Sequence, residues 1–208
     1  MQGGQQMIAV ETEDGLREIR LARPDKANAL TEAMLAALVE AVEAAGDERA
    51  LILTGEGRVF SAGADLEAAK AGLATSPLWE RLSGAIAAFA GLTIAALNGT
   101  LAGGACGMAL ACDLRLAVPG AKVFYPVMRL GYLPQPSDPA RLARLVGPAR
   151  AKLILLAGAK VEAEEALAWG LIDRIVPPEA LMKTARGLCA DVLGASADHV
   201  SAIKRLVV

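Results

Sequence analysis

The stretch from 82 to 112 holds no charged residue, although charged residues make up 21% of the chain. It is longer than the ~20 apolar residues that cross a bilayer, and it carries glycines at the four-residue spacing that packs helices in lipid. Against a membrane helix, Asn98-Gly99 and Gly103-Gly104 place turn residues inside the stretch. A buried strand over 93–97, a tight turn and a buried helix over 105–111 satisfy the same composition. We expect this second arrangement, and therefore no membrane-spanning helix.

Size and composition favour one α/β domain. The chain has 208 residues, enough to bury a core without disulfides or metals, and it is rich in Ala, Leu and Gly with few aromatic residues. Short Ile and Val strands between Ala-rich helical runs fit a helix-covered sheet better than a β-sandwich. We expect a single domain over 1–208, with a core over 1–175 and C-terminal helices over 176–208.

Charge and cysteine usage limit the classes of partner and the cellular compartment that we expect for this protein. A net charge of −2, with Lys and Arg scattered along the chain, provides no basic surface for nucleic acid. Cys106, Cys112 and Cys189 are odd in number and lack metal-ligand spacing, which predicts buried free thiols and no metal site. The N-terminus has no basic segment followed by an apolar one, so we expect no secretory signal and a cytoplasmic protein.

Turn residues and periodicity predict an alternation of strands and helices. Asp14-Gly15 separates two alternating strands and indicates a hairpin. Thr31 is expected as the N-cap of one helix, and Asp138-Pro139 as an N-cap followed by proline in another. Gly147-Pro148 should end that second helix and begin the next. The other expected elements are strands over 50–54, 93–97, 114–118, 122–125 and 171–176, a helix, loop and helix over 67–81, and helices over 162–169, 178–192 and 196–206.

Two glycine-bearing segments each follow an expected strand and open an expected helix. They are Phe60-Ser-Ala-Gly-Ala-Asp-Leu66 and Asn98-Gly-Thr-Leu-Ala-Gly-Gly-Ala-Cys-Gly-Met-Ala-Leu-Ala-Cys-Asp113. The first N–H groups of a helix have no intrahelical partner, and small residues let a ligand approach them. Backbone donors from two opposed segments can hold a developing oxyanion without any protonation state to manage. The sequence therefore predicts an oxyanion hole.

The order of several motifs resembles the crotonase, or enoyl-CoA hydratase/isomerase, superfamily from residue 8 to the C-terminus. Each motif alone is commonplace, but the set in this order is specific. The resemblance implies a spiral of ββα units, an acyl-CoA thioester as substrate, no cofactor beyond its coenzyme A, and a homotrimer or dimer of trimers. The motifs are Ala27-Asn28-Ala29-Leu30, Ser61-Ala-Gly-Ala-Asp-Leu66, Asn98-Gly99, Gly103-Gly104, Cys112-Asp113, Leu130-Gly131, Pro134, Ala166 and Gly170-Leu171-Ile172.

The resemblance also implies roles for individual residues. The N–H groups of Ala62 and Gly104 are expected to hold the thioester oxygen. The coenzyme A portion is expected to be bound by Lys26, Ala27 and Ala29 at its nucleotide end, and otherwise by Ala62, Gly63, Ala64, Asp65, Leu66 and Gly104.

The chain departs from the family at its acid and base positions. In the hydratases two glutamates flank the double bond, whereas the corresponding positions here are Gly107 and Val127. Neither residue can hold or release a proton, so ordinary hydration is not expected. Tyr132 is a candidate for acid–base work, or else packs its ring at a wet edge. Asp138 is a second candidate, or else a structural N-cap.

A further departure concerns the C-terminus. The family usually continues for another pair of helices that cover the coenzyme A and build the trimer contact, whereas this sequence ends at Val208. We therefore expect shortened C-terminal helices, which bears on both the trimer and the completeness of the coenzyme A pocket.

The leading interpretation is an enzyme of acyl-CoA and fatty acid metabolism, acting as a lyase, isomerase or hydrolase, that stabilises an enolate or a tetrahedral oxyanion. Decarboxylation or fragmentation could draw on the oxyanion hole alone, because one such donor is worth about 3 kcal/mol. The alternative is a non-catalytic acyl-CoA binder or assembly subunit that kept the fold. The residues expected in the pocket walls, over 66–79 and 125–134, fit an apolar or aromatic acyl group, or else fill the core.

Overall fold

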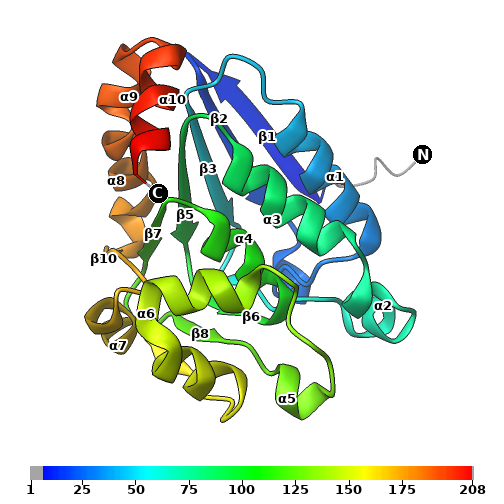
Figure 1. Cartoon of the computed structure of the whole chain (residues 1–208). Coiled ribbons are helices and arrows are strands. Elements are labelled where there is room, and N and C mark those ends of the chain that lie inside the picture. The colour runs from blue at the N-terminus through cyan, green and yellow to red at the C-terminus, as the bar shows by residue number, and fades with distance from the viewer. Residues whose placement is uncertain (1–6, 208) are drawn as a thin grey trace, which may run out of the picture.

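The computed structural model describes residues 7–207, which form two β-sheets with surrounding helices (Figure 1). The larger sheet has the strand order β1-β2-β3-β5-β7-β10, and only its β1–β2 pair is antiparallel. The smaller sheet has the order β4-β6-β8-β9, and only β8–β9 is antiparallel. The strands are β1 (Ile8–Glu13), β2 (Leu16–Leu21), β3 (Ala50–Gly55), β4 (Val59–Ser61), β5 (Leu92–Leu97), β6 (Thr100–Ala102), β7 (Leu114–Ala117), β8 (Lys122–Phe124), β9 (Val161–Glu162) and β10 (Arg174–Ile175).

Successive strands alternate between the two sheets. β3, β5 and β7 enter the larger sheet, and β4, β6 and β8, which follow them directly, enter the smaller one. Each strand pair is followed by helix, so the chain advances in ββα turns, as the resemblance implies. These helices are α2 (Leu66–Lys70) and α3 (Leu78–Ala88), then α4 (Cys106–Ala111), then α5 (Val127–Leu130) and α6 (Asp138–Leu155).

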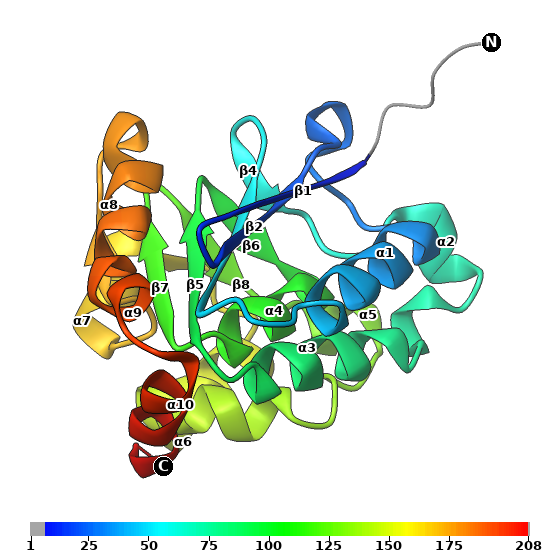
Figure 2. The same ribbon diagram turned by 90° about the horizontal axis from the view of Figure 1, so that it is seen from above.

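Helices cover both faces of the larger sheet. Figure 2 shows α1 and α3 on one side of it and α8 and α9 on the other. The central strands β3 and β5 are mostly apolar because both faces are buried, and Leu51, Ile52 and Ile94 are fully inaccessible. The remaining elements are α1 (Glu32–Glu43), α7 (Ala163–Trp169), α8 (Leu181–Leu188), α9 (Ala190–Gly194), α10 (Ala197–Leu206), and the 3-10 turns η1 (Pro24–Lys26), η2 (Leu73–Thr75), η3 (Gly103–Ala105) and η4 (Pro178–Ala180).

The uncharged stretch folds as a strand, a turn and a helix, as expected. It supplies the end of α3, then β5, β6, η3 and α4, and every residue of α4 is buried. The three-residue strand β6 was not expected, because a strand this short shows no periodicity in the sequence. Within residues 7–207, none of the helices has the length and apolar character that crossing a membrane requires.

Several local predictions are confirmed by backbone geometry. The Asp14-Gly15 hairpin forms between β1 and β2. The Thr31 hydroxyl accepts a hydrogen bond from the Met34 N–H at 3.2 Å and caps α1. Gly147 interrupts α6 with a φ of 79°, so the helical run consists of two helices joined at a kink.

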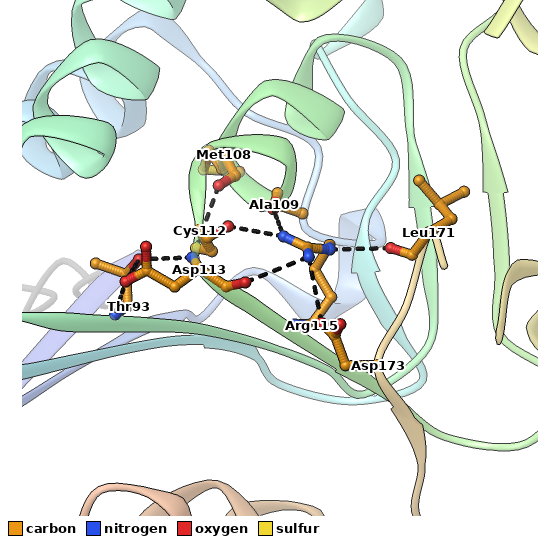
Figure 3. A network of polar contacts seen from close by, with 8 residues as sticks. All are labelled: Thr93, Met108, Ala109, Cys112, Asp113, Arg115, Leu171 and Asp173. Carbon is orange, nitrogen blue, oxygen red and sulfur yellow. Dashed lines mark hydrogen bonds and ion pairs between the residues drawn. The ribbon is translucent and has the colours of Figure 1, made fainter. Parts of the chain in front are cut away.

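A buried arginine joins the end of α4 to the larger sheet (Figure 3). Arg115 on β7 is 4% exposed, and its guanidinium donates to the carbonyl oxygens of Cys112 at 2.7 Å and Leu171 at 2.9 Å. It also forms an ion pair with Asp173 at 3.2 Å. Carbonyls at the end of a helix lack intrahelical donors, so this side chain satisfies groups that would otherwise be buried unpaired.

Candidate active site

Three strand ends of the smaller sheet meet at one edge. β4, β6 and β8 are parallel neighbours, so the residues that follow them leave the sheet on the same side. Those residues are Ala62, Gly103 and Tyr125, respectively. The topology thus brings together two glycine segments that lie about forty positions apart in the sequence, with an aromatic residue from a third turn of the spiral.

The two glycine segments touch through their glycines. Gly63 has a φ of 91°, and a Cβ on it would lie 2.9 Å from the Ala102 carbonyl oxygen. A Cβ on Gly103 would lie 3.6 Å from the Gly63 Cα. The prediction that the two segments face each other is therefore confirmed, and Gly63 allows both a left-handed backbone and this close approach.

The backbone donors of the first segment are mostly used by the fold. The Ala62 N–H donates to the Ala27 carbonyl at 3.0 Å, and the Asp65 N–H donates to the Leu30 carbonyl at 2.8 Å. The Ala64 N–H lies between them, and none of the residues from 7 to 207 accepts a hydrogen bond from it. Ala64 therefore presents a free donor at the turn of this segment.

The hydrogen bond from Ala62 to Ala27 contradicts the expectation that Ala62 offers a free N–H. The loop after η1 runs alongside the first glycine segment and takes up the Ala62 donor through Ala27. The left-handed backbone of Gly63 separates the Ala62 and Ala64 peptide groups, so the two N–H groups have different surroundings. A partner this far along the chain cannot be read from the local motif.

The second segment supplies its donor at the start of a helix. Gly104 lies in η3, which continues into α4, and the first N–H groups of such a turn have no partner within it. No hydrogen bond formed by the described part of the chain uses this N–H. Gly104 packs under the Trp79 indole, which donates its own ring N–H to the Leu73 carbonyl at 2.7 Å.

Gly104→Val should disturb the protein itself as well as any ligand. A Cβ on Gly104 would lie 3.3 Å from three Trp79 ring atoms, so a branched side chain must displace the indole. Overpacking of this kind costs about 1–3 kcal/mol. We expect lower stability in urea unfolding and altered tryptophan fluorescence. A Gly84→Val variant, whose added Cβ meets nothing within 4 Å, provides the comparison, and equal losses in both variants would contradict this account.

A pocket of about 340 Å³ opens over the two free donors. Its walls come from α2, α3, α5 and the strand ends, and its mouth carries exposed apolar side chains, Leu66, Leu130 and Leu133. Exposed leucines around a concavity are typical of a binding site for an apolar ligand and not of an ordinary solvated surface. Among the residues that line the pocket are Ala62, Ala64, Leu66, Trp79, Gly104, Tyr125, Val127 and Tyr132.

The other residues expected to bind coenzyme A lie outside the pocket lining. Gly63 packs behind the pocket wall. Ala27 and Ala29 belong to the loop that pairs with the first glycine segment, and Lys26 is exposed beside them. This loop has a rigid anchor, because the fully buried Asn28 side chain accepts from the Arg23 N–H and donates to two backbone carbonyls.

Asp65 has a structural role in this geometry. Its carboxylate forms an ion pair with Arg23 at 2.9 Å and accepts from the Glu67 N–H at 3.1 Å, which caps α2. The hydrogen bond from Arg23, together with those from the α2 backbone, lowers the pKa of Asp65. Asp65 thus fixes the start of the helix that forms one wall of the pocket.

Gly107 and Val127, the two positions at which the resemblance implies glutamates, differ in their surroundings. Val127 is buried and lines the pocket, so its position faces the ligand space with an aliphatic side chain. Gly107 lies on α4 and faces another acid, since a Cβ there would lie 2.9 Å from Asp138 Oδ1. Tyr132 lines the mouth and is 38% exposed.

Asp138 is not the N-cap that the sequence predicts. Ser137 occupies the position before α6, and no side chain caps that helix. The Asp138 carboxylate instead turns into the protein, where it is 1% exposed and accepts a hydrogen bond from the Tyr125 hydroxyl at 2.9 Å. The local Asp-Pro signal is the same for both arrangements, and only packing against Tyr125 and Gly107 distinguishes them.

The buried environment of Asp138 shifts its pKa upward. Burial raises the pKa of Asp138 to about 6, against the Tyr125 hydrogen bond and the Arg141 charge, which lower it. Its Oδ1 atom has no hydrogen-bond partner among the described residues. A buried polar atom without a hydrogen bond costs about 1–3 kcal/mol, and the cation that faces this oxygen, Arg141, lies at 3.8 Å, beyond hydrogen-bond distance. Perturbed carboxyls of this kind gather at functional sites.

Tyr125 is the pocket residue whose chemistry the sequence did not single out. It is 4% exposed, lines the pocket, and contacts Asp138 through its hydroxyl. Tyr125 follows β8 at the same edge of the sheet as the glycine segments. This position would have indicated a pocket residue only if the strand order had been known.

The family relationship follows from comparison with known proteins. Residues 11–208 match the family model described as enoyl-CoA hydratase/isomerase. A crotonyl-CoA hydratase from Syntrophomonas wolfei is 35% identical over 195 residues, covering 89% of this chain and 75% of that protein. A 4-chlorobenzoyl coenzyme A dehalogenase from an Arthrobacter species is also 35% identical, covering 94% of this chain and 75% of that protein. The chain belongs to the enoyl-CoA hydratase/isomerase family.

Solved structures show the same fold. A putative enoyl-CoA hydratase/carnithine racemase from Magnetospirillum magneticum superposes with a TM-score of 0.90 at 31% identity, covering 98% of this chain and 82% of that one. An enoyl-CoA hydratase subunit from Geobacillus kaustophilus gives 0.87 at 35% identity, covering 97% and 81%. The crotonase-type α/β architecture is therefore confirmed.

Proposed function

We propose that this protein is an enzyme that binds an acyl-CoA thioester and stabilises an enolate or a tetrahedral oxyanion between the N–H groups of Ala64 and Gly104. The observation that carries the proposal is that these two N–H groups have no acceptor among residues 7–207 and belong to facing segments that line one pocket. Two fixed backbone donors suit an oxygen that gains negative charge during a reaction.

The acyl group fits the apolar part of the pocket. Leu66, Leu130 and Leu133 surround the mouth, and Trp79 and Val127 lie within the lining. The names of the relatives include both an aliphatic and an aromatic CoA ester, crotonyl-CoA and 4-chlorobenzoyl coenzyme A. An apolar aliphatic or aromatic acyl chain is the substrate class that this pocket supports best.

The reaction differs from hydration through paired glutamates. Position 127 faces the pocket as valine and position 107 has no side chain, so neither can move a proton. Decarboxylation, fragmentation or isomerisation of the acyl chain requires enolate stabilisation, which the two donors supply. We further propose that the protein works in a reducing cytoplasmic compartment, which its three free buried cysteines support, and that it assembles as a trimer like the family.

A second candidate function is non-catalytic binding of acyl-CoA, favoured by the same loss of ionisable groups at 107 and 127. The test is a panel of CoA thioesters that includes crotonyl-CoA and malonyl-CoA, with binding measured by calorimetry and products by mass spectrometry. Consumption of a thioester supports the enzyme, and binding without consumption of any supports the binder. A protein that binds no member of the panel contradicts both.

A further inference from the structure

A carboxyl group occupies the space beside Gly107 that a side chain at this position would need. Asp138 Oδ1 and Oδ2 lie 2.9 and 3.1 Å from where a Cβ on Gly107 would be. Gly104 and Gly107 are three residues apart on a continuous helical segment, so they share a face one turn apart. The Asp138 carboxyl of α6 therefore lies one turn from η3, which offers the Gly104 donor.

Tyr125 links this buried carboxyl to the pocket. Its hydroxyl donates to Asp138 Oδ2 at 2.9 Å and accepts from the Gln135 N–H at 3.3 Å. Both Tyr125 and Gln135 line the pocket, whereas Asp138 does not. Tyr125 thus both lines the pocket and hydrogen-bonds the carboxyl, which makes it the connection between the two.

We propose that Tyr125 and Asp138 form the proton-transfer pair of this pocket, with Tyr125 acting at the α-carbon of the bound thioester and Asp138 as the positioning residue that takes and returns the hydroxyl proton. The inference rests on the proposed function, because the α-carbon is placed by the thioester oxygen held at Ala64 and Gly104. The inference also gives the site a group that carries protons, because Gly107 and Val127 have no ionisable side chain.

The transfer balances without any further reactant. The Tyr125 oxygen accepts the proton of the α-carbon while its own proton passes to the Asp138 carboxylate. The C–H electron pair moves into the thioester, which becomes an enolate held by the two backbone donors. The reverse transfer returns a proton to the carbon, and exchange of the Asp138 proton with solvent renews the pair. A tyrosine alone is a weak base near neutral pH, so the carboxylate is required.

The charged and titratable groups around the pair set its response to pH. Arg141 on α6 lies 3.8 Å from Asp138 Oδ1, and the Glu80 carboxylate on α3 bonds to Ser137. Cys106 on α4 is buried, and burial raises the pKa of its thiol. Burial also raises the pKa of the Tyr125 hydroxyl, which keeps it protonated in the resting state. Asp138, with its pKa raised to about 6, is the group that titrates in the working range.

The test is exchange of α-protons in deuterated water, with phenylacetyl-CoA as the probe, because its ring and thioester both acidify the α-protons. Exchange is followed by mass spectrometry, and binding by calorimetry. Tyr125→Phe and Asp138→Asn should each lower the exchange rate about 100-fold, the scale of one acid–base group, with Kd changed less than threefold. Glu18→Gln is the control, since it alters a buried carboxylate that is paired with Arg186 on another face.

The pH profile separates proton transfer from a structural role. Transfer to Asp138 requires its carboxylate, so wild-type exchange should fall as the pH drops through about 6 and level off above it. The residual exchange of Asp138→Asn should lose that inflection. Thermal unfolding of each variant shows whether the fold is intact.

Each outcome bears on a different claim. Binding with exchange that depends on both residues supports the pair. Binding with no exchange, or with exchange unchanged in folded Tyr125→Phe, overturns the pair and leaves the proposed binding site standing. Absence of binding to phenylacetyl-CoA and to every ester of the panel overturns the proposed function, and this inference with it.

Discussion

Ala64→Pro should lower the turnover of whichever CoA thioester the wild type consumes by about 100- to 1,000-fold, the effect of removing one oxyanion donor. Proline has no N–H, and its ring fills the space toward which that group points. The fold should tolerate the change, because no residue between 7 and 207 uses this donor. Steady-state rates and calorimetric Kd values on the purified variant provide the measurement.

Two matched variants distinguish Ala64 from its neighbour. Ala64→Gly keeps the donor and should retain most of the turnover. Ala62→Pro removes an N–H that donates to Ala27 at 3.0 Å, so its main effect should be a loss of about 1–3 kcal/mol of stability. If Ala64→Pro turned over thioester at the wild-type rate while folded Ala62→Pro did not, the donor would be Ala62 and the assignment made here would be wrong.

The difference between Ala62 and Ala64 shows where sequence reasoning stops. The motif and its place before a helix predict that backbone donors gather there, and the structure confirms that the two glycine segments meet. Which N–H is free depends on the pairing of this segment with Ala27 and Leu30, more than thirty positions earlier in the chain. Local sequence patterns predict strands and turns, but they do not predict which distant carbonyl accepts a hydrogen bond from a given N–H.

Asp138 shows the same limit from the side-chain end. An Asp-Pro pair before a helical run indicates an N-cap, and the helix does begin there. The carboxyl nevertheless turns toward Tyr125, which directly follows β8, and Gly107 on α4. Three elements separated in sequence must pack before this arrangement exists. The absence of a side chain at position 107, noted in the sequence only as a missing glutamate, is what leaves room for it.

Arg115→Met should cost about 3–5 kcal/mol of stability, the penalty for breaking a buried ionic network by removing one partner. Methionine fills much of the space of the arginine stem but donates no hydrogen bond. The carbonyls of Cys112 and Leu171 would remain buried without donors, and Asp173 would lose its ion pair (Figure 3). This arginine also ties the end of α4 to β7, so its loss should loosen the helix that presents Gly104.

Urea unfolding of Arg115→Met, with Arg115→Lys and Lys122→Ala beside it, measures the effect. Lysine keeps the charge but cannot reach several carbonyls at once, so it should restore only part of the lost stability. Lys122 forms an ion pair with Glu162 at 2.8 Å in which both side chains are about half exposed, and its removal should cost less than about 1 kcal/mol. Similar losses of unfolding free energy for Arg115→Met and Lys122→Ala would contradict this prediction. The buried network would then contribute no more than an exposed ion pair, as expected if water replaced Arg115 as the donor to the carbonyls.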